Sequence, residues 1–281
     1  METLIPSRLS TLGHPQRLAL FRLLMRRFPD LVPAGELADA LGLKASTLSA
    51  YLSALMQAGL VTQEREGTSL RYSVDMDEVR GTLDYLLFDC CRGRPDLCAP
   101  LTLSPKSGTH PTTDRKYNVL FICTGNSARS IFAESILRKQ AGDRFNAFSA
   151  GTRPGSQLNP FAVHVLKEKG HDISVLRSKD VSEFSDPDAP HFDFVFTVCN
   201  QAANEECPAW EDQPVTGHWG MPDPVKAEGN DARKALAFQE AYGALKHRID
   251  LFTALNLESL SRLALQSRID DIGRKPSEES S

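Results

Sequence analysis

Cys123 and Arg129 are the residues whose spacing points most clearly to chemistry. They enclose a five-residue loop in the stretch "FICTGNSARS", with β-forming residues before it and a helical pattern after it. In such a loop the backbone N–H groups converge on one point, the helix N-terminus adds positive potential, and the guanidinium supplies a planar fork. We therefore predict a cradle for a tetrahedral oxyanion, whose field lowers the pKa of Cys123 and makes its thiolate a nucleophile. The predicted oxyanion-binding residues are Thr124, Gly125, Asn126, Ser127, Ala128 and Arg129.

Two further residues are predicted to assist the thiolate. Ser130 directly follows the arginine of the loop and is placed to donate a hydrogen bond to Cys123. Asp223, in the Asp-Pro step of "GHWGMPDPVKAEG", follows a β-like run and is the candidate acid for a leaving group. An Asp-Pro step by itself is equally typical of a turn, so this assignment depends on the loop and the acid meeting in space.

Two more cysteines, Cys199 and Cys207, lie further along the chain. Cys199 ends a β-like run, and Cys207 follows eight residues later within the polar run "NQAANEECP". Hydrolysis at the loop needs only one cysteine, one arginine and one acid, so two additional thiols indicate a redox function. The alternative is a pair of ordinary core cysteines. The polar surroundings of Cys207 argue against it.

The elements that must position these residues alternate between strands and helices. Strands are predicted at 118–122, 145–149, 192–198 and 215–218, and helices begin near Arg129, Asn159 and Asp231. This alternation predicts an α/β fold. In such folds, active residues gather at the carboxyl ends of the strands, where the cysteine loop, Cys199 and the segment with Asp223 all lie.

The length of 281 residues is sufficient for two domains, and the composition is that of a globular protein with 32 basic and 36 acidic side chains. No apolar run approaches the roughly 20 residues of a membrane span, and the first residues lack a signal-peptide core. We expect a cytoplasmic protein without a membrane partner, whose thiols stay reduced. The predicted divisions are 1–98, a linker rich in Pro, Ser and Thr at 99–115, a second domain at 116–273 and a polar tail at 274–281.

The first domain has the pattern of a mainly α-helical winged helix-turn-helix. A short helix at 36–41, a turn at Gly42 and a helix at about 45–58 precede the stretch "LVTQEREGTSLRYSV", which predicts two strands around a tight turn. Such a unit places its second helix in the major groove and the cations of its wing near phosphates. A small protein-interaction module is the alternative. The predicted DNA-binding residues are Lys44, Ser46, Thr47, Ser49, Arg65 and Arg71.

Residues 7–98, above all "LGHPQRLALFRLL", resemble the arsenic-responsive family of winged-helix repressors. The resemblance implies a homodimer formed through the N-terminal domain, which leaves its operator DNA when a metal or metalloid binds. Tyr51 stands where many members have histidine, and the first helix of the turn lacks the cysteine pair of one known inducer site. Any sensing thiols must therefore lie elsewhere in the domain.

Residues 116–255 resemble the low-molecular-weight tyrosine phosphatase fold, which implies a four-stranded parallel sheet flanked by helices. Within that fold, arsenate reductase is the closer match. The segments that carry this resemblance are "FICTGNSARS", "FTVCNQAANEECPAW" and "GHWGMPDPVKAEG". The resemblance implies arsenate as substrate, a disulfide relay from Cys123 through Cys199 to Cys207, and thioredoxin as reductant. In the best-known thioredoxin-coupled members the last two cysteines are seven residues apart, so glutaredoxin or glutathione stays an alternative. Glu134 and Ser149 match residues that bind a potassium ion in some relatives.

Cys90, Cys91 and Cys98 form a cluster at the end of the first domain, in "DCCRGRPDLC", after a predicted helix at 78–89. Zinc would need a fourth ligand, and no histidine lies between residues 15 and 109. Trivalent arsenic is a soft ion that takes three thiolates, and the cluster resembles an inducer site of some arsenic-responsive repressors. We expect arsenite to bind here as inducer, with unrelated thiols as the alternative.

Three functions are consistent with this sequence. The expected one is an arsenite-responsive repressor fused to an arsenate reductase that needs no tightly bound cofactor. The others are a phosphatase with a DNA-binding module and a transcription factor whose second domain only binds an oxyanion. The additional cysteines argue against the phosphatase, and the predicted acid argues against a simple binding domain.

Overall fold

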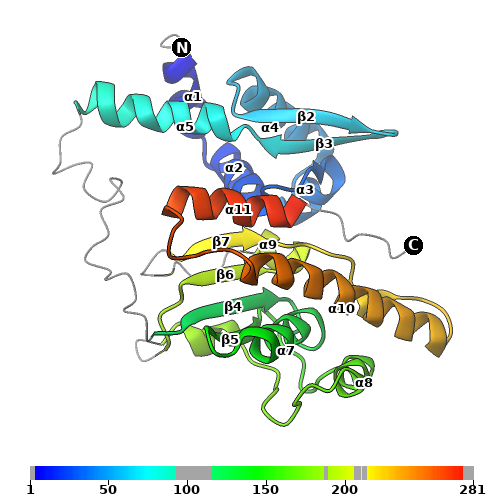
Figure 1. Cartoon of the computed structure of the whole chain (residues 1–281). Coiled ribbons are helices and arrows are strands. Elements are labelled where there is room, and N and C mark those ends of the chain that lie inside the picture. Colours follow the sequence, from blue (N-terminus) through cyan, green and yellow to red (C-terminus); the bar gives the residue numbers. More distant parts are fainter. Residues whose placement is uncertain (1–3, 93–114, 187–188, 206–209, 211–213, 275–281) are drawn as a thin grey trace. The chain divides into compact units, whose positions relative to one another are not determined.

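The computed structural model describes residues 4–92, 115–186, 189–205, 210 and 214–274. The chain forms two compact units, Met1–His110 and Pro111–Ser281. Figure 1 shows the elements of each unit, coloured along the sequence. Among the described residues, no helix has both the length and the apolar character needed to cross a membrane. The predicted linker lies outside the described residues except for Arg115.

The first unit is mainly helical, with a small antiparallel sheet in the order β1-β3-β2. Its core is formed by buried apolar side chains of residues 20–24, 37 and 48–55 on the helices, together with apolar side chains from the three strands. The elements are α1 (Ile5–Leu12), α2 (Pro15–Arg27), β1 (Val32–Pro33), α3 (Ala34–Leu41), α4 (Ala45–Gln57), β2 (Val61–Glu66), β3 (Ser69–Val74), α5 (Met76–Asp84) and the π-helix η2 (Tyr85–Cys90).

The helix-turn-helix and its wing are where the sequence predicts them. Gly42 ends α3 at a φ of 61°, a left-handed conformation that glycine adopts without steric cost. On α4, the periodic leucines Leu48, Leu52 and Leu55 are buried. Tyr51, which lies at helical spacing from these leucines, is only half-buried. The predicted fold class of this unit is confirmed.

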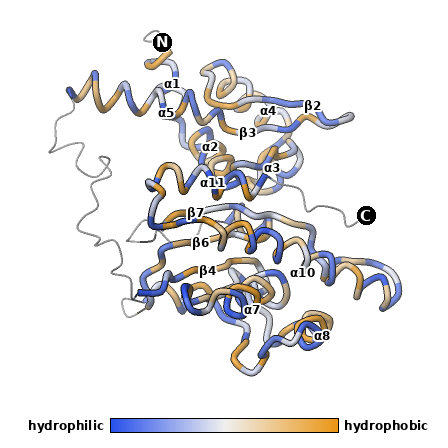
Figure 2. The backbone as a smooth tube through the Cα atoms, viewed as in Figure 1, coloured by the Kyte–Doolittle hydropathy of each residue, from blue (hydrophilic) through white to orange (hydrophobic). Residues whose placement is uncertain are grey.

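The helix predicted at 78–89 begins at Met76 and changes its winding near its end. At Tyr85 the α-helix becomes a π-helix, in which the backbone N–H of Cys91 bonds to the Leu86 carbonyl at 2.9 Å. Apolar and polar residues alternate along this segment (Figure 2), and Phe88 is 64% exposed. The sequence pattern indicated a helix here but carried no signal for the wider winding.

The second unit is an α/β fold with a four-stranded parallel sheet in the order β5-β4-β6-β7. Its elements are β4 (Tyr117–Cys123), α7 (Arg129–Ala141), β5 (Phe145–Gly151), α8 (Pro160–Glu168), the 3₁₀-helix η3 (Val181–Phe184), β6 (Phe194–Thr197), α9 (Asn200–Asn204), β7 (Val215–His218), the 3₁₀-helix η4 (Pro224–Lys226), α10 (Asp231–Thr253) and α11 (Arg262–Arg274).

The central strand β4 delivers the candidate nucleophile to the edge of the sheet. Its residues 119–122 are fully buried between neighbouring strands and helices, which explains their continuous apolar run. All four predicted strands are present, and α7, α8 and α10 begin within one residue of the predicted positions. The predicted parallel sheet is confirmed.

Helix α11 was not among the predicted helices. It packs against β7 and α10 and buries Leu265, Ile269 and Ile272. Ile269 lies so close to β7 that a Cβ added to Gly217 would be 2.6 Å from its side chain. The contact therefore requires glycine on the strand, which tertiary packing alone reveals.

Candidate active site

The predicted oxyanion loop connects the end of β4 to the start of α7. The Cys123 Sγ lies 2.9 Å from the Ser130 hydroxyl and accepts the Asn126 backbone N–H at 3.2 Å. Asn126 has a φ of 43°, an unusual value for a residue with a side chain. The loop thus closes tightly around the sulfur, and the structure brings Ser130 to it.

The carbonyl groups of the loop are held from outside by the segment that follows β5. Backbone N–H groups of Thr152, Arg153, Gly155 and Asn159 donate to loop carbonyls at 2.9 to 3.1 Å. A trans peptide points its N–H away from its carbonyl, so loop amides next to these carbonyls point inward. This arrangement suits the convergence of N–H groups that an oxyanion needs. The carbonyls belong to Cys123, Thr124, Gly125 and Ser127, in chain order.

The side chain of Asn126 is fully buried and fixes the shape of the loop. Its amide nitrogen donates to the hydroxyls of Ser130 at 2.8 Å and Ser149 at 2.9 Å. Its amide oxygen accepts the backbone N–H of Lys179 at 2.7 Å. Sequence reasoning placed this asparagine in the oxyanion loop but missed its part as the centre of a hydrogen-bond network.

Arg129 and Asp223 meet at the mouth of the loop. An Arg129 guanidinium nitrogen lies 2.8 Å from the Asp223 carboxylate, and another donates to the Met221 carbonyl at 3.2 Å. Arg129 is buried, whereas the Asp223 side chain is 25% exposed. The structure therefore brings the predicted acid to the loop from a segment 94 residues away in the sequence.

The segment that carries Asp223 is anchored by Arg248 of α10. The buried Arg248 guanidinium donates to the carbonyls of Trp219 at 2.7 Å and Gly220 at 3.1 Å. A Cβ added to Gly220 would lie 2.5 Å from the Asn200 side-chain oxygen, so the segment passes close to α9. Sequence reasoning missed Arg248, because an arginine within a helical pattern carries no sign of what it contacts.

Cys199 lies beside the loop and caps α9. Its side chain is buried, and its Sγ is 3.4 Å from the Thr124 hydroxyl. The Sγ also accepts the Ala202 backbone N–H at 3.4 Å, at the start of α9. Cys207 lies outside the described residues. Of the predicted relay, the structure therefore places Cys123 and Cys199 in one site.

The predicted low pKa of Cys123 is wrong for the loop as it stands. Burial raises the pKa of this thiol above its usual value, and the neighbouring Cys199 acts in the same direction. The Ser130 hydrogen bonds and the charge of Arg129 lower the pKa but do not outweigh burial. The sequence prediction considered the field of the loop and not the desolvation of the sulfur.

The residues predicted to hold potassium do not fit that ion in this chain. The Glu134 carboxylate, which accepts a hydrogen bond from Ser149, lies 3.0 Å from the Lys179 ammonium. Arg138 pairs with its other oxygen at 2.6 Å. Two cations of the protein itself already neutralise the carboxylate, so a potassium ion would meet a repelling ammonium here.

The predicted DNA-binding residues of the first unit lie on or just before α4 and on the wing strands β2 and β3. Lys44, Ser46 and Ser49 are exposed on and before α4, opposite its buried leucines, and Thr47 is half-buried. Arg65 is exposed on β2. Arg71, also predicted on the wing, is half-buried and pairs with Glu66 at 2.6 Å. Its charge is thus partly neutralised within the hairpin.

The cysteine cluster of the first unit is only partly within the described residues. Cys90 is exposed at the end of η2, Cys91 is half-buried directly after it, and Cys98 lies outside the described residues. Both described thiols are free. π-Helical turns are frequent at functional sites.

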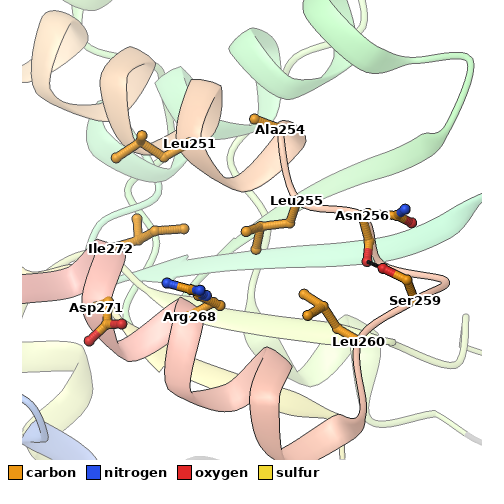
Figure 3. A pocket seen from close by; sticks show the side chains of 9 residues that line it. All are labelled: Leu251, Ala254, Leu255, Asn256, Ser259, Leu260, Arg268, Asp271 and Ile272. Atoms are coloured by element: carbon orange, nitrogen blue, oxygen red, sulfur yellow. Dashed lines mark hydrogen bonds between the residues drawn. The ribbon is translucent and has the colours of Figure 1, made fainter.

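A pocket of about 350 Å³ in the second unit contains none of the predicted site residues (Figure 3). It lies between the end of α10, the following loop and α11. Its lining is mainly apolar, with Arg268 and Asp271 on α11. This pocket therefore shares no lining residue with the loop at Cys123.

Comparison with known proteins agrees with this geometry. Residues 118–262 match the family described as low molecular weight phosphotyrosine protein phosphatase, and residues 12–64 match a helix-turn-helix domain. An arsenate reductase of Bacillus licheniformis is 41% identical over 138 residues, which are 49% of this chain and 95% of the relative. An arsenate reductase of Bacillus subtilis is 36% identical over 135 residues, 48% of this chain and 93% of the relative.

Among solved structures, an arsenate reductase from Archaeoglobus fulgidus has a TM-score of 0.38 at 25% identity, covering 47% of this chain and 98% of that one. The assignment depends on the sequence matches, which cover nearly the whole length of the two relatives. The chain joins an N-terminal helix-turn-helix domain to a C-terminal arsenate-reductase-like domain, and it belongs to the low molecular weight phosphotyrosine protein phosphatase family.

Proposed function

We propose that the second unit is a thiol-dependent arsenate reductase and that the first is an arsenite-responsive repressor of transcription. The observation that carries the reductase is the position of Cys199, whose sulfur lies 3.4 Å from the Thr124 hydroxyl of the oxyanion loop. A hydrolase needs no second thiol beside its nucleophile, whereas reduction needs two thiols to supply two electrons. The identity to arsenate reductases supports arsenate as the oxyanion.

The first step joins Cys123 to arsenate. The loop amides and Arg129 hold the arsenate oxygens, and the Cys123 sulfur attacks the pentavalent arsenic. An S–As bond forms as one As–O bond breaks, and the leaving oxygen takes a proton from Asp223 and departs as water. The proton lost by the thiol balances the proton that Asp223 gives.

The second step reduces the arsenic. Cys199 attacks the sulfur of Cys123, the S–As bond breaks, and its electron pair stays on arsenic, which leaves as trivalent arsenite. The two thiols are thereby oxidised to a disulfide. Cys207 then attacks Cys199, releases Cys123 as a thiol and passes the disulfide to a reductant. We favour thioredoxin, and glutaredoxin with glutathione is the alternative, both in a reducing compartment such as the cytoplasm.

The test is arsenate-dependent oxidation of NADPH, coupled to thioredoxin and its reductase or to glutaredoxin, glutathione and glutathione reductase. We expect turnover in one system, and its loss in Cys199→Ser. Hydrolysis of a chromogenic phosphate ester without arsenate turnover in either system would contradict the proposal and support a phosphatase. Cys207→Ser separates the reductants, because a glutathione-coupled enzyme does not need the third thiol.

The first unit supports DNA binding through α4 and Arg65. The exposed small polar residues of α4 leave room for close approach to bases, and Lys44 and Arg65 supply phosphate contacts. We propose a homodimer, since Leu83 and Phe88 expose apolar surface on α5 and η2. In this proposal arsenite binds the thiols of Cys90, Cys91 and Cys98 and releases the operator.

The repressor is tested with DNA from the promoter region next to its own gene. We expect salt-dependent binding and release by arsenite, measured by fluorescence anisotropy. Changing all three cysteines to serine should preserve DNA binding and abolish release. Release by arsenite from this triple variant would show that the sensing site is elsewhere.

A further inference from the structure

Lys179 is a charged residue buried beside the oxyanion loop, in the segment between α8 and η3. Only 7% of the residue is exposed. Its ammonium donates at 3.0 Å to the Glu134 carboxylate and at 3.0 Å to the Arg177 carbonyl. Burying an ammonium is unfavourable unless it is paired and hydrogen-bonded, as it is here. The buried and paired ammonium of Lys179 therefore indicates a specific role for this charge.

The oxygen atoms around the ammonium are those that a monovalent cation takes as ligands. They are a carboxylate oxygen of Glu134 and the backbone carbonyl of Arg177, and the Ser149 hydroxyl donates to the same carboxylate oxygen. Hard cations prefer oxygen ligands of this kind. The ammonium therefore stands where a bound alkali ion would stand, but it is attached to the chain.

Hydrogen bonds connect this charge to the nucleophile. Ser149 links Glu134 to the Asn126 amide at 2.9 Å, and Asn126 donates to the Ser130 hydroxyl at 2.8 Å. Ser130 lies 2.9 Å from the Cys123 sulfur. Each bond of this path joins buried groups, where an unsatisfied partner is costly.

Lys179 reaches Asn126 by a second route as well. Its own backbone N–H donates to the Asn126 amide oxygen at 2.7 Å. The Lys179 ammonium thus acts on the Asn126 amide nitrogen through Glu134 and Ser149, and the Lys179 backbone binds the amide oxygen directly. Because Asn126 sits at a φ of 43°, the loop needs such support to keep this conformation.

We propose that Lys179 is a positioning residue whose ammonium is a tethered substitute for a bound monovalent cation. It holds Glu134, Ser149 and Asn126 so that Ser130 stays against Cys123, and it makes the loop independent of potassium. The importance of this role for turnover rests on the proposed reductase function. The positioning role of Lys179 is measured as the reactivity of the Cys123 thiol, and this measurement does not require arsenate turnover.

The test compares the full-length wild type with Lys179→Ala, Lys179→Met and the control Lys246→Met. Lys246 also pairs with a carboxylate, at 2.7 Å from Asp250, but on the exposed side of α10. The readout is the rate of Cys123 alkylation by iodoacetamide as a function of pH, followed by mass spectrometry. Potassium chloride, methylammonium chloride and choline chloride are compared at equal ionic strength.

In choline we expect both Lys179 variants to be alkylated about tenfold more slowly near neutral pH, because a raised pKa of Cys123 lowers the thiolate fraction. Potassium or methylammonium should restore most of the rate in Lys179→Ala, where the missing side chain leaves room. They should not restore it in Lys179→Met, whose side chain fills that room. The wild type and Lys246→Met should not distinguish the three salts.

Three results would overturn the proposal: a wild type that reacts faster in potassium than in choline, a Lys179→Ala variant that reacts like the wild type, or a slow Lys179→Ala variant that neither cation restores. The comparison of salts on the wild type needs no variant. It can therefore refute the proposal even if both Lys179 substitutions prevent folding. A wild type that passes the thiol test but reduces no arsenate would refute the reductase and leave the role of Lys179 intact.

Discussion

Two groups of cysteines on one chain lie in opposite surroundings. Cys123 and Cys199 are 2% and 1% exposed, at the carboxyl edge of a parallel sheet, and Ser130 contacts the sulfur of Cys123. Cys90 is exposed and Cys91 half-buried at the end of a π-helix. In the first group the fold controls approach and ionisation. In the second group, a soft ion in the solvent can reach the thiols, and the proposed sensing function requires this access.

The largest expected effect separates the two groups by function. Cys123→Ser should lower arsenate turnover by at least about a thousandfold, because nothing else in the loop can form the covalent intermediate. The double variant Cys90→Ser, Cys91→Ser should reduce arsenate at the wild-type rate and lose release from DNA by arsenite. The coupled NADPH assay and DNA anisotropy measure the two activities. Loss of arsenate turnover in the double variant would show that the two groups of cysteines do not have separate functions.

The next effect concerns Asp223, the predicted acid beside Cys123 and Cys199. Arg248→Met removes two hydrogen bonds to the segment carrying Asp223, so we expect kcat to fall by about tenfold to a hundredfold, part of what general acid catalysis contributes. Binding of phosphate to the loop, measured by calorimetry, should change by less than about twofold, because the loop at Cys123 stays intact.

The matched control for this variant is Arg144→Met. Arg144 also donates to two backbone carbonyls, those of Thr253 and Leu255, but away from the site. Its substitution should leave kcat unchanged. Equal losses of kcat in both variants would mean that Arg248 has only a general structural role.

A smaller effect tests how the fold controls ionisation of Cys123. Burial raises the pKa of this thiol and Ser130 lowers it, so Ser130→Ala should raise the pKa further and slow alkylation near neutral pH. The profile of rate against pH should move to higher pH. Cys90 should react faster than Cys123 in every variant, because it is exposed.

Ser135→Ala is the control, since Ser135 lies on the same helix and contacts His171 instead of the nucleophile. It should leave the alkylation profile of Cys123 in place. A profile for Ser130→Ala that matches the wild type would show that the hydroxyl does not affect ionisation of the thiol.

The smallest effect is on stability and arises in the core behind the site. Burial lowers the pKa of His171, which bonds Ser135 at 2.9 Å and Tyr242 at 2.7 Å. Because the folded pKa lies below the unfolded value of 6.5, the unfolded chain binds the extra proton first as pH falls. The stability from neutral His171 should be fully present above pH 6.5 and decline below it.

Thermal denaturation at a series of pH values measures this decline, with His171→Gln as comparison. The substitution should flatten the pH dependence of the melting temperature below 6.5, because the titrating group is gone. His164 is exposed on α8, so His164→Gln should leave that dependence unchanged. Identical slopes in the wild type and in His171→Gln would exclude His171 as the source.

Much of the fold was predictable because its signals are local. Residues 119–123 of the strand at 117–123 form a continuous apolar run, and the helix that follows begins at the arginine of the loop. The leucines of α4 repeat at helical spacing, and Gly42 marks the end of α3. In contrast, α11 lies beyond the matched family region, and its short amphipathic pattern was not distinguished from a loop.

The site was predictable only in part. Its reacting residues have types and spacings that can be recognised in a sequence, whereas the residues that hold them in position do not. A cysteine and an arginine with five residues between them, an aspartate before proline and a second cysteine at a strand end are visible in one dimension. Lys179 and Arg248 have no such pattern. Each contacts the site across many residues of sequence, and only packing shows which carbonyl or carboxylate it meets.

The sequence alone determined that a nucleophilic cysteine would stand in an oxyanion loop between a strand and a helix, since loop, strand and helix are set by neighbouring residues. Tertiary structure decided how that cysteine ionises and what holds it. Burial raises the pKa of Cys123 where the loop alone would lower it, and the ammonium of Lys179 takes the place predicted for potassium. Both depend on desolvation and on charges that meet only when distant segments fold together.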